Sequence, residues 1–117
     1  MTATTMRGVR TSWIVLALIA GTAVIHLSRA MVDPEISVLF ALNAIGYFVL
    51  GALLYAPLPA LDPWRSKIRW ALIAYAATTI VLFFVWGFMS EDWPMIGFVD
   101  KAIESALIAF LLLERRG

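Results

Sequence analysis

The sequence predicts an all-α integral membrane protein, a four-helix bundle whose helices run up-down-up-down. Composition is the first reason: 62% of the 117 residues are hydrophobic and 15% are charged, whereas soluble domains hold about 45–50% apolar and about 25% charged residues. The second reason is that the apolar residues gather in four runs, each close to the roughly 20 residues that a helix needs to cross a bilayer. The chain is therefore expected to form a single transmembrane domain, residues 1–117, multi-pass in the cell membrane.

The four predicted spans are separated by links that contain proline. The spans cover residues 12–30, 36–56, 68–89 and 95–113. Pro34 lies between the first two spans, Pro57, Pro59 and Pro63 lie between the second and the third, and Pro94 precedes the fourth. Proline lacks the backbone N–H that a helix interior uses, so no helix is expected to continue through the middle link. Such short links make neighbouring helices antiparallel.

The lysines and arginines predict which side of the membrane each link faces. Seven of them flank the spans on one side: Arg7, Arg10, Arg65, Lys67, Arg69, Arg115 and Arg116. Only Arg29 and Lys101 lie toward the other side. Basic residues accumulate on the cytoplasmic side of membrane proteins, so both termini are expected in the cytoplasm. The opposite side would carry the acidic links, with Asp33, Glu35, Glu91 and Asp92.

The first span also has features of a signal peptide. Residues 6–30 have a basic start, an apolar stretch and a small-x-small ending at Ser28-Arg29-Ala30. Removal of this segment would leave three spans and an N-terminus outside the cell. We favour the interpretation that it is a retained first span.

Several kinds of site and partner are excluded by composition. The chain has no cysteine, which removes disulfides, thiolate metal sites and iron–sulfur clusters. Its net charge is +1 and its basic residues form no patch, so no nucleic-acid partner is expected. Zinc spacings, phosphate-binding glycine loops and nucleophile elbows are absent from the sequence. The expected partners are the lipid bilayer and either further copies of the chain or a larger membrane complex.

Polar residues inside the spans gather toward the non-cytoplasmic side. At about 1.5 Å per residue, Glu104 lies roughly 13 Å from that end of its span, Asn43 roughly 10 Å and His26 roughly 6 Å. Tyr47 is one turn deeper than Asn43. A carboxylate as deep as Glu104 is costly in lipid and by default indicates a functional site. Asp100 and Lys101 are near enough to the boundary to reach water.

Helical spacing predicts that these residues meet inside the bundle. Residues three or four apart share a helix face, and intramembrane ionisable groups face the bundle interior and pair. Glu104 is expected to meet His26 or Asn43, and a protonated Glu104 would donate a hydrogen bond to either. Asp100 is expected to meet Arg29 or Lys101. The candidate polar site consists of His26, Arg29, Asn43, Tyr47, Asp100 and Glu104.

Three functions fit this pattern, and no cofactor follows from the sequence. The favoured hypothesis is a non-enzymatic accessory or self-associating subunit, because the chain is small and has no catalytic motif. A second is transport of a small solute or protons by a homo-oligomer that uses Glu104 and His26. A third is haem, chlorin or quinone binding between helices through His26. His26 and Glu104 are too few ligands for a catalytic metal site, so no metal is predicted.

Overall fold

The computed structural model describes residues 3–32 and 37–116 of the chain, with side chains for residues 12–31 and 37–114. The described chain is all-helical and consists of α1 (Ala3–Val32), α2 (Ser37–Tyr55), the 3-10 helix η1 (Pro59–Trp64), α3 (Arg65–Ser90) and α4 (Met95–Arg116). The prediction of four long helices is confirmed. Asp33, Pro34 and Glu35, which the sequence assigns to the first link, lie outside the described residues.

Three helices are longer than predicted. The helix α1 starts at Ala3, α3 extends from Arg65 to Ser90, and α4 ends at Arg116, whereas the apolar runs covered 12–30, 68–89 and 95–113. Hydropathy locates only the part of a helix that lipid would cover, and helical hydrogen bonding continues into the polar flanks. The middle link interrupts the α-helix as expected, but it is itself partly helical, because η1 includes Pro63.

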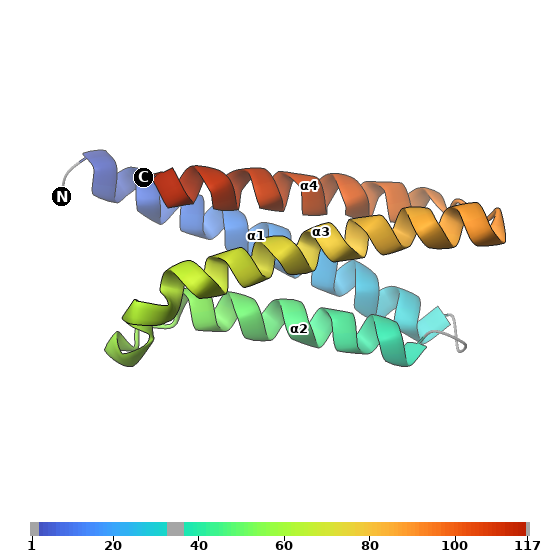
Figure 1. Ribbon diagram of the computed structural model, residues 1–117, viewed down its shortest axis with the longest axis horizontal. Helices are drawn as coiled ribbons and strands as arrows, with labels where there is room; N and C mark the ends of the chain where they lie inside the picture. The colour runs from blue at the N-terminus through green and yellow to red at the C-terminus, as the bar shows by residue number, and fades with distance from the viewer. Residues whose placement is uncertain (1–2, 33–36, 117) are drawn as a thin grey trace.

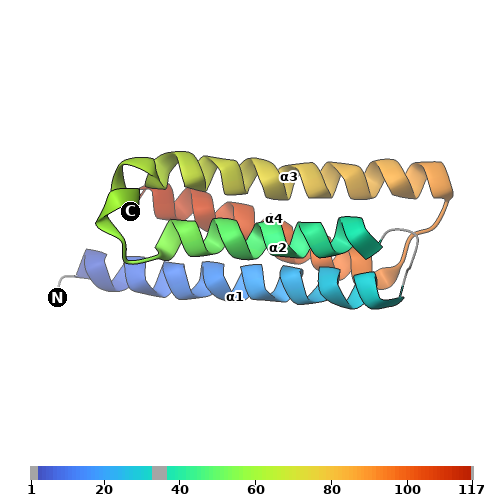
Figure 2. The ribbon, with the colours of Figure 1, turned by 90° about the horizontal axis from the view of Figure 1, so that it is seen from below.

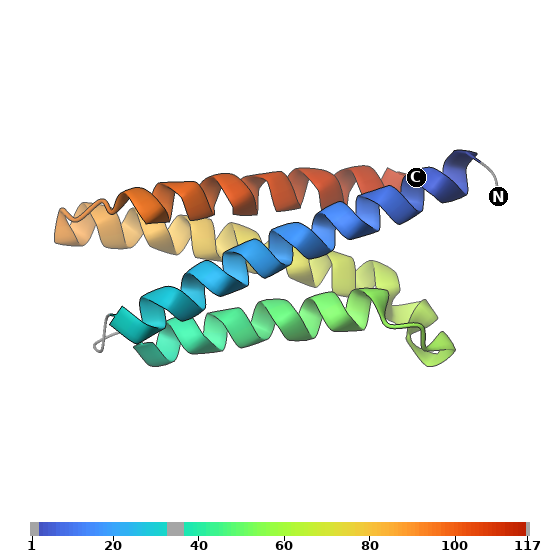
Figure 3. The same cartoon turned by 180° about the vertical axis from the view of Figure 1, so that it is seen from behind.

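The four helices lie along the long axis of a molecule that measures 50 × 23 × 20 Å. The first turn of α1 and the last turn of α4 lie at the same end as η1 (Figures 1 and 2). We call the half of the bundle that contains η1 the proximal half, and the half that contains the α3–α4 link the distal half. In the distal half, α1 lies beside α2 and α3 beside α4, and the two pairs diverge (Figures 1 and 3).

Three helical segments are long and apolar enough to cross a membrane: Ser12–Met31, Ser37–Tyr55 and Pro59–Ser90. The surface of α2 illustrates this, because Val38, Leu39 and Ile45 expose more than half of their side chains. Exposed apolar surface of this extent suits contact with lipid rather than with water. The helix α4 is as long but carries three charged residues, Asp100, Lys101 and Glu104, in its first ten positions.

The proximal half is packed with apolar side chains. Its buried core comprises Val15, Ile19, Leu54, Leu72, Leu107 and Leu111. One polar contact joins three helices at its edge: the Tyr55 hydroxyl donates to both carboxylate oxygens of Glu114, at 2.9 and 2.7 Å. The Arg69 guanidinium pairs with the same carboxylate at 3.2 Å.

Arg65 closes the end of α2. Its guanidinium donates to the carbonyl oxygens of Leu54 at 2.6 Å, Ala56 at 2.5 Å and Leu53 at 3.1 Å. The last carbonyls of a helix have no partner within the helix, and a cation there also suits the helix dipole. The basic residue at the start of α3 therefore terminates α2 and fixes the link between them.

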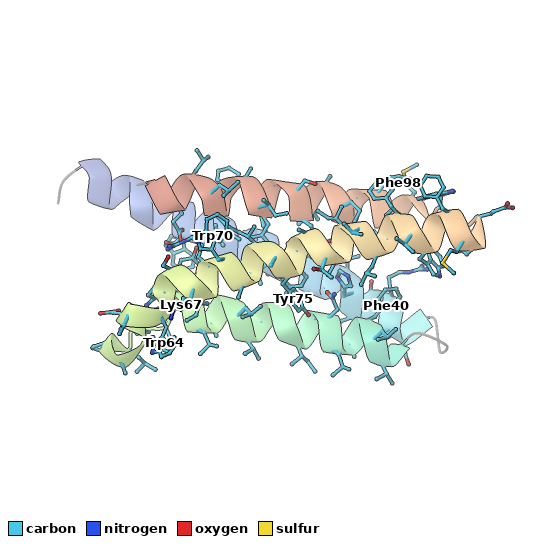
Figure 4. All side chains as sticks on the ribbon, viewed as in Figure 1. Phe40, Trp64, Lys67, Trp70, Tyr75 and Phe98 are labelled. Carbon is cyan, nitrogen blue, oxygen red and sulfur yellow. The ribbon has the colours of Figure 1, made fainter. Side chains whose placement is uncertain are left out.

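Close packing between α2 and α3 depends on Gly46. The phenol ring of Tyr75 occupies the space that a side chain at this position would need. The Tyr75 hydroxyl thereby reaches the backbone carbonyl of Asn43, at 2.8 Å. Figure 4 shows Tyr75 between the two helices. The glycine thus serves contact within this bundle.

Candidate functional site

Seven polar side chains from all four helices are buried together. We call this group the polar cluster: Thr22 and His26 from α1, Tyr47 from α2, Thr79 from α3, and Asp100, Lys101 and Glu104 from α4. Each exposes less than 9% of its surface. The group extends from the middle of the bundle into the distal half. Burial of this much polarity is tolerated only where the groups satisfy one another.

Glu104 lies at the bottom of the polar cluster and is completely buried. The Tyr47 hydroxyl donates to its Oε2, and the Thr79 hydroxyl contacts the same oxygen. Its other oxygen, Oε1, pairs with the Lys101 ammonium. Both oxygens are therefore engaged, by groups from three helices.

Asp100 lies one helical turn nearer the distal end and shares the same cation. The Thr22 hydroxyl donates to its Oδ1. The Lys101 ammonium lies 3.0 Å from Oδ2, and Nε2 of His26 lies 3.6 Å from that atom. One ammonium thus bridges two buried carboxylates. The removal of one partner from such an arrangement leaves an uncompensated buried charge.

His26 is held in place by a hydrogen bond of one ring nitrogen. Its Nδ1 lies 2.8 Å from the backbone carbonyl of Thr22, so Nδ1 must carry the proton and donate it. Nε2 then faces the Asp100 carboxylate.

The polar cluster contains two carboxylates, those of Asp100 and Glu104, and one ammonium, that of Lys101. Charge left uncompensated in a low-dielectric interior is costly. Both carboxylates therefore depend on the ammonium that they share.

A cavity of about 270 Å³ lies next to the polar cluster, between the diverging helix pairs. Its walls are largely apolar and include Leu39, Phe40, Leu82, Phe83, Trp86 and Ile96. Figure 4 shows Phe40 in the distal part of α2. Polar groups that line it are His26, Arg29, Asn43, Thr79, Asp100 and Lys101. An apolar pocket with a few convergent polar groups is the usual form of a small-molecule site.

Two polar groups of the cavity have no partner among the described residues. The side-chain oxygen Oδ1 of Asn43 is buried and accepts no hydrogen bond there. Within the same part of the chain, the ion pairs of the distal half involve His26, Asp100, Lys101 and Glu104 but not Arg29. As far as the structure describes the chain, the cavity therefore contains an unpaired amide oxygen and an unpaired guanidinium.

The structure separates the six residues selected from the sequence into two groups. His26, Tyr47, Asp100 and Glu104 are members of the polar cluster. Arg29 and Asn43 line the cavity beside it. The hydrogen bonds of Glu104 go to Tyr47 and Thr79 rather than to Asn43 or His26. The longer tyrosine side chain, one turn below Asn43, reaches the depth of the carboxylate.

The expectation that Asp100 and Lys101 reach water is wrong. Asp100 is 3% exposed and Lys101 is 8% exposed. The Lys101 ammonium turns inward because two carboxylates attract it, and its position lies 5.5 Å from the centre of the Phe83 ring. Pairing of Asp100 with Lys101, one of the two predicted alternatives, is present.

Three members of the polar cluster, Thr22, Thr79 and Lys101, are missing from the residues selected from the sequence. Lys101 was assigned to the boundary, although its spacing of three from Glu104 places both on one helix face. Thr79 gave no signal, because a threonine in a membrane helix usually bonds its own backbone. Thr78 does so, donating to the Ala74 carbonyl at 2.8 Å, and the Thr79 hydroxyl lies 2.9 Å from the Ala76 carbonyl in addition to its contact with Glu104.

A metal ion has three ligand side chains within reach in this group. One ligand atom each from His26, Asp100 and Glu104 lies within 4.8 Å of the others. The Lys101 ammonium, however, contacts both carboxylates. It thereby supplies the positive charge that a metal ion would bring. The chemistry of this arrangement is that of a closed ion-pair network with an internal cation.

Comparison of the chain with protein-family models, with curated proteins and with solved structures gives no match.

Proposed function

We propose that the chain is a non-enzymatic, multi-pass protein of the cell membrane that holds one small apolar molecule with a polar end in the distal cavity. It acts as an accessory or self-associating binding subunit. The observation that carries the proposal is the cavity itself, with apolar walls and with the buried groups His26, Asp100 and Lys101 at its polar side. A single-chain lipid or a quinone has this combination of an apolar body and a polar end.

The polar cluster supports binding over turnover. All four carboxylate oxygens of Asp100 and Glu104 are engaged by protein groups. A general base needs a free lone pair within reach of its substrate. The cluster is thus better suited to shape and polarise one wall of a binding site.

The apolar core supports binding over passage through one chain. Below Glu104, the proximal half is filled by Leu54, Leu72, Leu107 and Leu111, which expose at most 3% of their surface. A proton or solute that entered from the distal side would meet this layer without a polar group to accept it. A cavity closed on one side retains its ligand.

The molecule would cross the membrane four times, up-down-up-down, with both termini in the cytoplasm. The charges of α4 do not oppose this, because Asp100, Lys101 and Glu104 are buried against the other helices. Most of the described residues that α4 exposes, such as Phe98 and Val99, are apolar, and Ser105 is polar. At the proximal end, Trp64 and Lys67 lie near the middle link, as expected at a cytoplasmic boundary (Figure 4).

Single cysteines test this orientation, because the chain has none of its own. Ser90 and Ser66 are both exposed and lie at opposite ends of α3. In intact cells, a membrane-impermeant maleimide is expected to label Ser90→Cys but to label Ser66→Cys only after lysis. The reverse pattern would overturn the proposed orientation.

The cavity is tested by filling it. Leu82 and Val81 are each 59% exposed, but of the two only Leu82 lines the cavity. Wild type, Leu82→Trp and Val81→Trp are purified from membranes in mild detergent, extracted with organic solvent and compared by chromatography with mass spectrometry. We expect one compound in molar proportion to wild type and to Val81→Trp, and its loss from Leu82→Trp. Equal amounts of every compound in the two variants would rule out this cavity as the binding site.

A further inference from the structure

We infer that the molecule held in the cavity is a single-chain amphiphile with an anionic head, and that Arg29 recognises the head. This inference rests on the proposed function and adds the charge class of the ligand. The argument begins with the positive charges next to the cavity, which belong to Lys101 and Arg29.

The Lys101 charge is not available to a ligand. Its ammonium contacts Asp100 and Glu104, and these two carboxylates together outweigh it. An anion that approached Lys101 would also approach both carboxylates and would be repelled by them.

Arg29 is in a different situation. It lines the cavity from α1, one turn beyond His26, and forms no ion pair among the described residues. Its guanidinium can donate two parallel hydrogen bonds to a carboxylate or phosphate head. The nearby side-chain amide of Asn43, whose oxygen is buried and unpartnered, can contact a hydroxyl or a protonated oxygen of the same head. The spare cation of the cavity therefore complements an anion.

The size of the cavity limits the ligand to one chain. Its volume of about 270 Å³ is below the roughly 300–1,000 Å³ of pockets for drug-sized ligands. Leu39 and Leu82 line the cavity and are also 68% and 59% exposed, so they form its border with the surrounding lipid. The head and first carbons would lie inside, and the remaining chain would leave along these leucines.

The test compares three probes with the same chain and different heads. Dodecanoate, dodecyl phosphate and dodecanol are offered to the full-length protein in phosphatidylcholine nanodiscs at pH 8, where carboxylates and phosphates are charged. Equilibrium dialysis with radiolabelled probes gives the saturable binding above that of empty nanodiscs. At least one anion is expected to bind about tenfold more tightly than dodecanol, the difference that one charge-assisted contact supplies. The anion that binds more tightly distinguishes a fatty-acid head from a phosphate head.

Arg29→Gln is expected to bring the anion to the affinity of dodecanol, and Arg29→Lys is expected to retain most of the preference. Lys67→Gln, which removes an exposed cation at the proximal end, is the matched control and should leave binding unchanged. Equal binding of anions and alcohol to wild type overturns the inference while the proposed function stands. An anion preference that survives Arg29→Gln also overturns it. If none of the three probes binds saturably, both the inference and the proposed function are contradicted.

Discussion

Polar contacts join the helices in both halves of the bundle, and those of the distal half are more deeply buried. In the distal half, the side chains of Glu104 and Lys101 are 0% and 10% exposed. In the proximal half, Glu114 pairs with Tyr55 and Arg69 at the edge of the core, where the side chains of Glu114 and Arg69 are 10% and 18% exposed. The comparison shows that the same residue types have different roles at different depths.

The consequence of removing one partner of a carboxylate depends on how deeply the carboxylate is buried in the bundle. A carboxylate at the proximal edge that loses a partner can turn toward water or lipid head groups. A carboxylate in the middle of the bundle has neither, so it remains an uncompensated charge or must take up a proton. The distal contacts are therefore a condition for the fold, whereas the proximal contacts adjust its stability.

The largest effect that separates the two halves is expected from Lys101→Met. Methionine has a similar volume but no charge, so Asp100 and Glu104 lose their shared cation and face each other. Breaking a buried ion pair in this way costs about 3–5 kcal/mol of unfolding free energy. The measurement is equilibrium unfolding in mixed micelles, with increasing SDS in dodecyl maltoside, followed by circular dichroism.

Two companion variants sharpen this prediction. Glu104→Gln leaves the pair between Lys101 and Asp100, at 3.0 Å, and an amide oxygen that Tyr47 can still bond. The unfolding free energy lost by Glu104→Gln is expected to be roughly 1 kcal/mol, the size of one interhelical hydrogen bond. Lys67→Met, at an exposed position 5.0 Å from the Trp64 ring, should change stability by less than about 0.5 kcal/mol. Equal losses for Lys101→Met and Glu104→Gln would mean that the ammonium does not serve both carboxylates.

The sequence was sufficient for the helices but not for the partners within the polar cluster. Apolar runs and proline links predicted four helices, because hydropathy depends only on local composition. The inward orientation of His26, Asp100 and Glu104 followed from the cost of exposing them to lipid. The choice of partner for Glu104 did not follow, because it depends on how far each helix is rotated and on side-chain length. Tyr47 and Asn43 share a face, and only the bundle geometry decides which reaches the carboxylate.

The position of Lys101 illustrates a second limit. A lysine near a helix end usually extends its ammonium toward the membrane surface. In this bundle the ammonium is drawn inward by two carboxylates of its own helix, those of Asp100 and Glu104. Spacing along α4 was compatible with both arrangements, and the difference between them is an electrostatic balance. Rules based on local sequence do not include the attraction between the Lys101 ammonium and the two carboxylates.

The smallest expected effect is that of Tyr55→Phe in the proximal half. The variant removes the hydroxyl that donates to Glu114 at 2.7 and 2.9 Å, while the ion pair between Glu114 and Arg69 remains. Because this carboxylate keeps a cation and lies at the edge of the core, the loss should be about 0.6 kcal/mol, the average for interhelical hydrogen bonds in membranes. The same micelle unfolding assay measures it.

The salt dependence of stability is a control that distinguishes the proximal ion pair from the buried distal one. Ion pairs near water are screened within about 3 Å at 1 M salt, whereas buried pairs are screened far less. We therefore expect 1 M NaCl to reduce the stability lost on Arg69→Gln, which removes the proximal ion pair, and to leave the loss on Lys101→Met unchanged. If Tyr55→Phe destabilised the protein as much as Lys101→Met, or if salt affected both ion pairs equally, depth would not be what distinguishes the two halves. The proximal contacts would then have to be as free of water as the polar cluster, despite the exposure of Arg69.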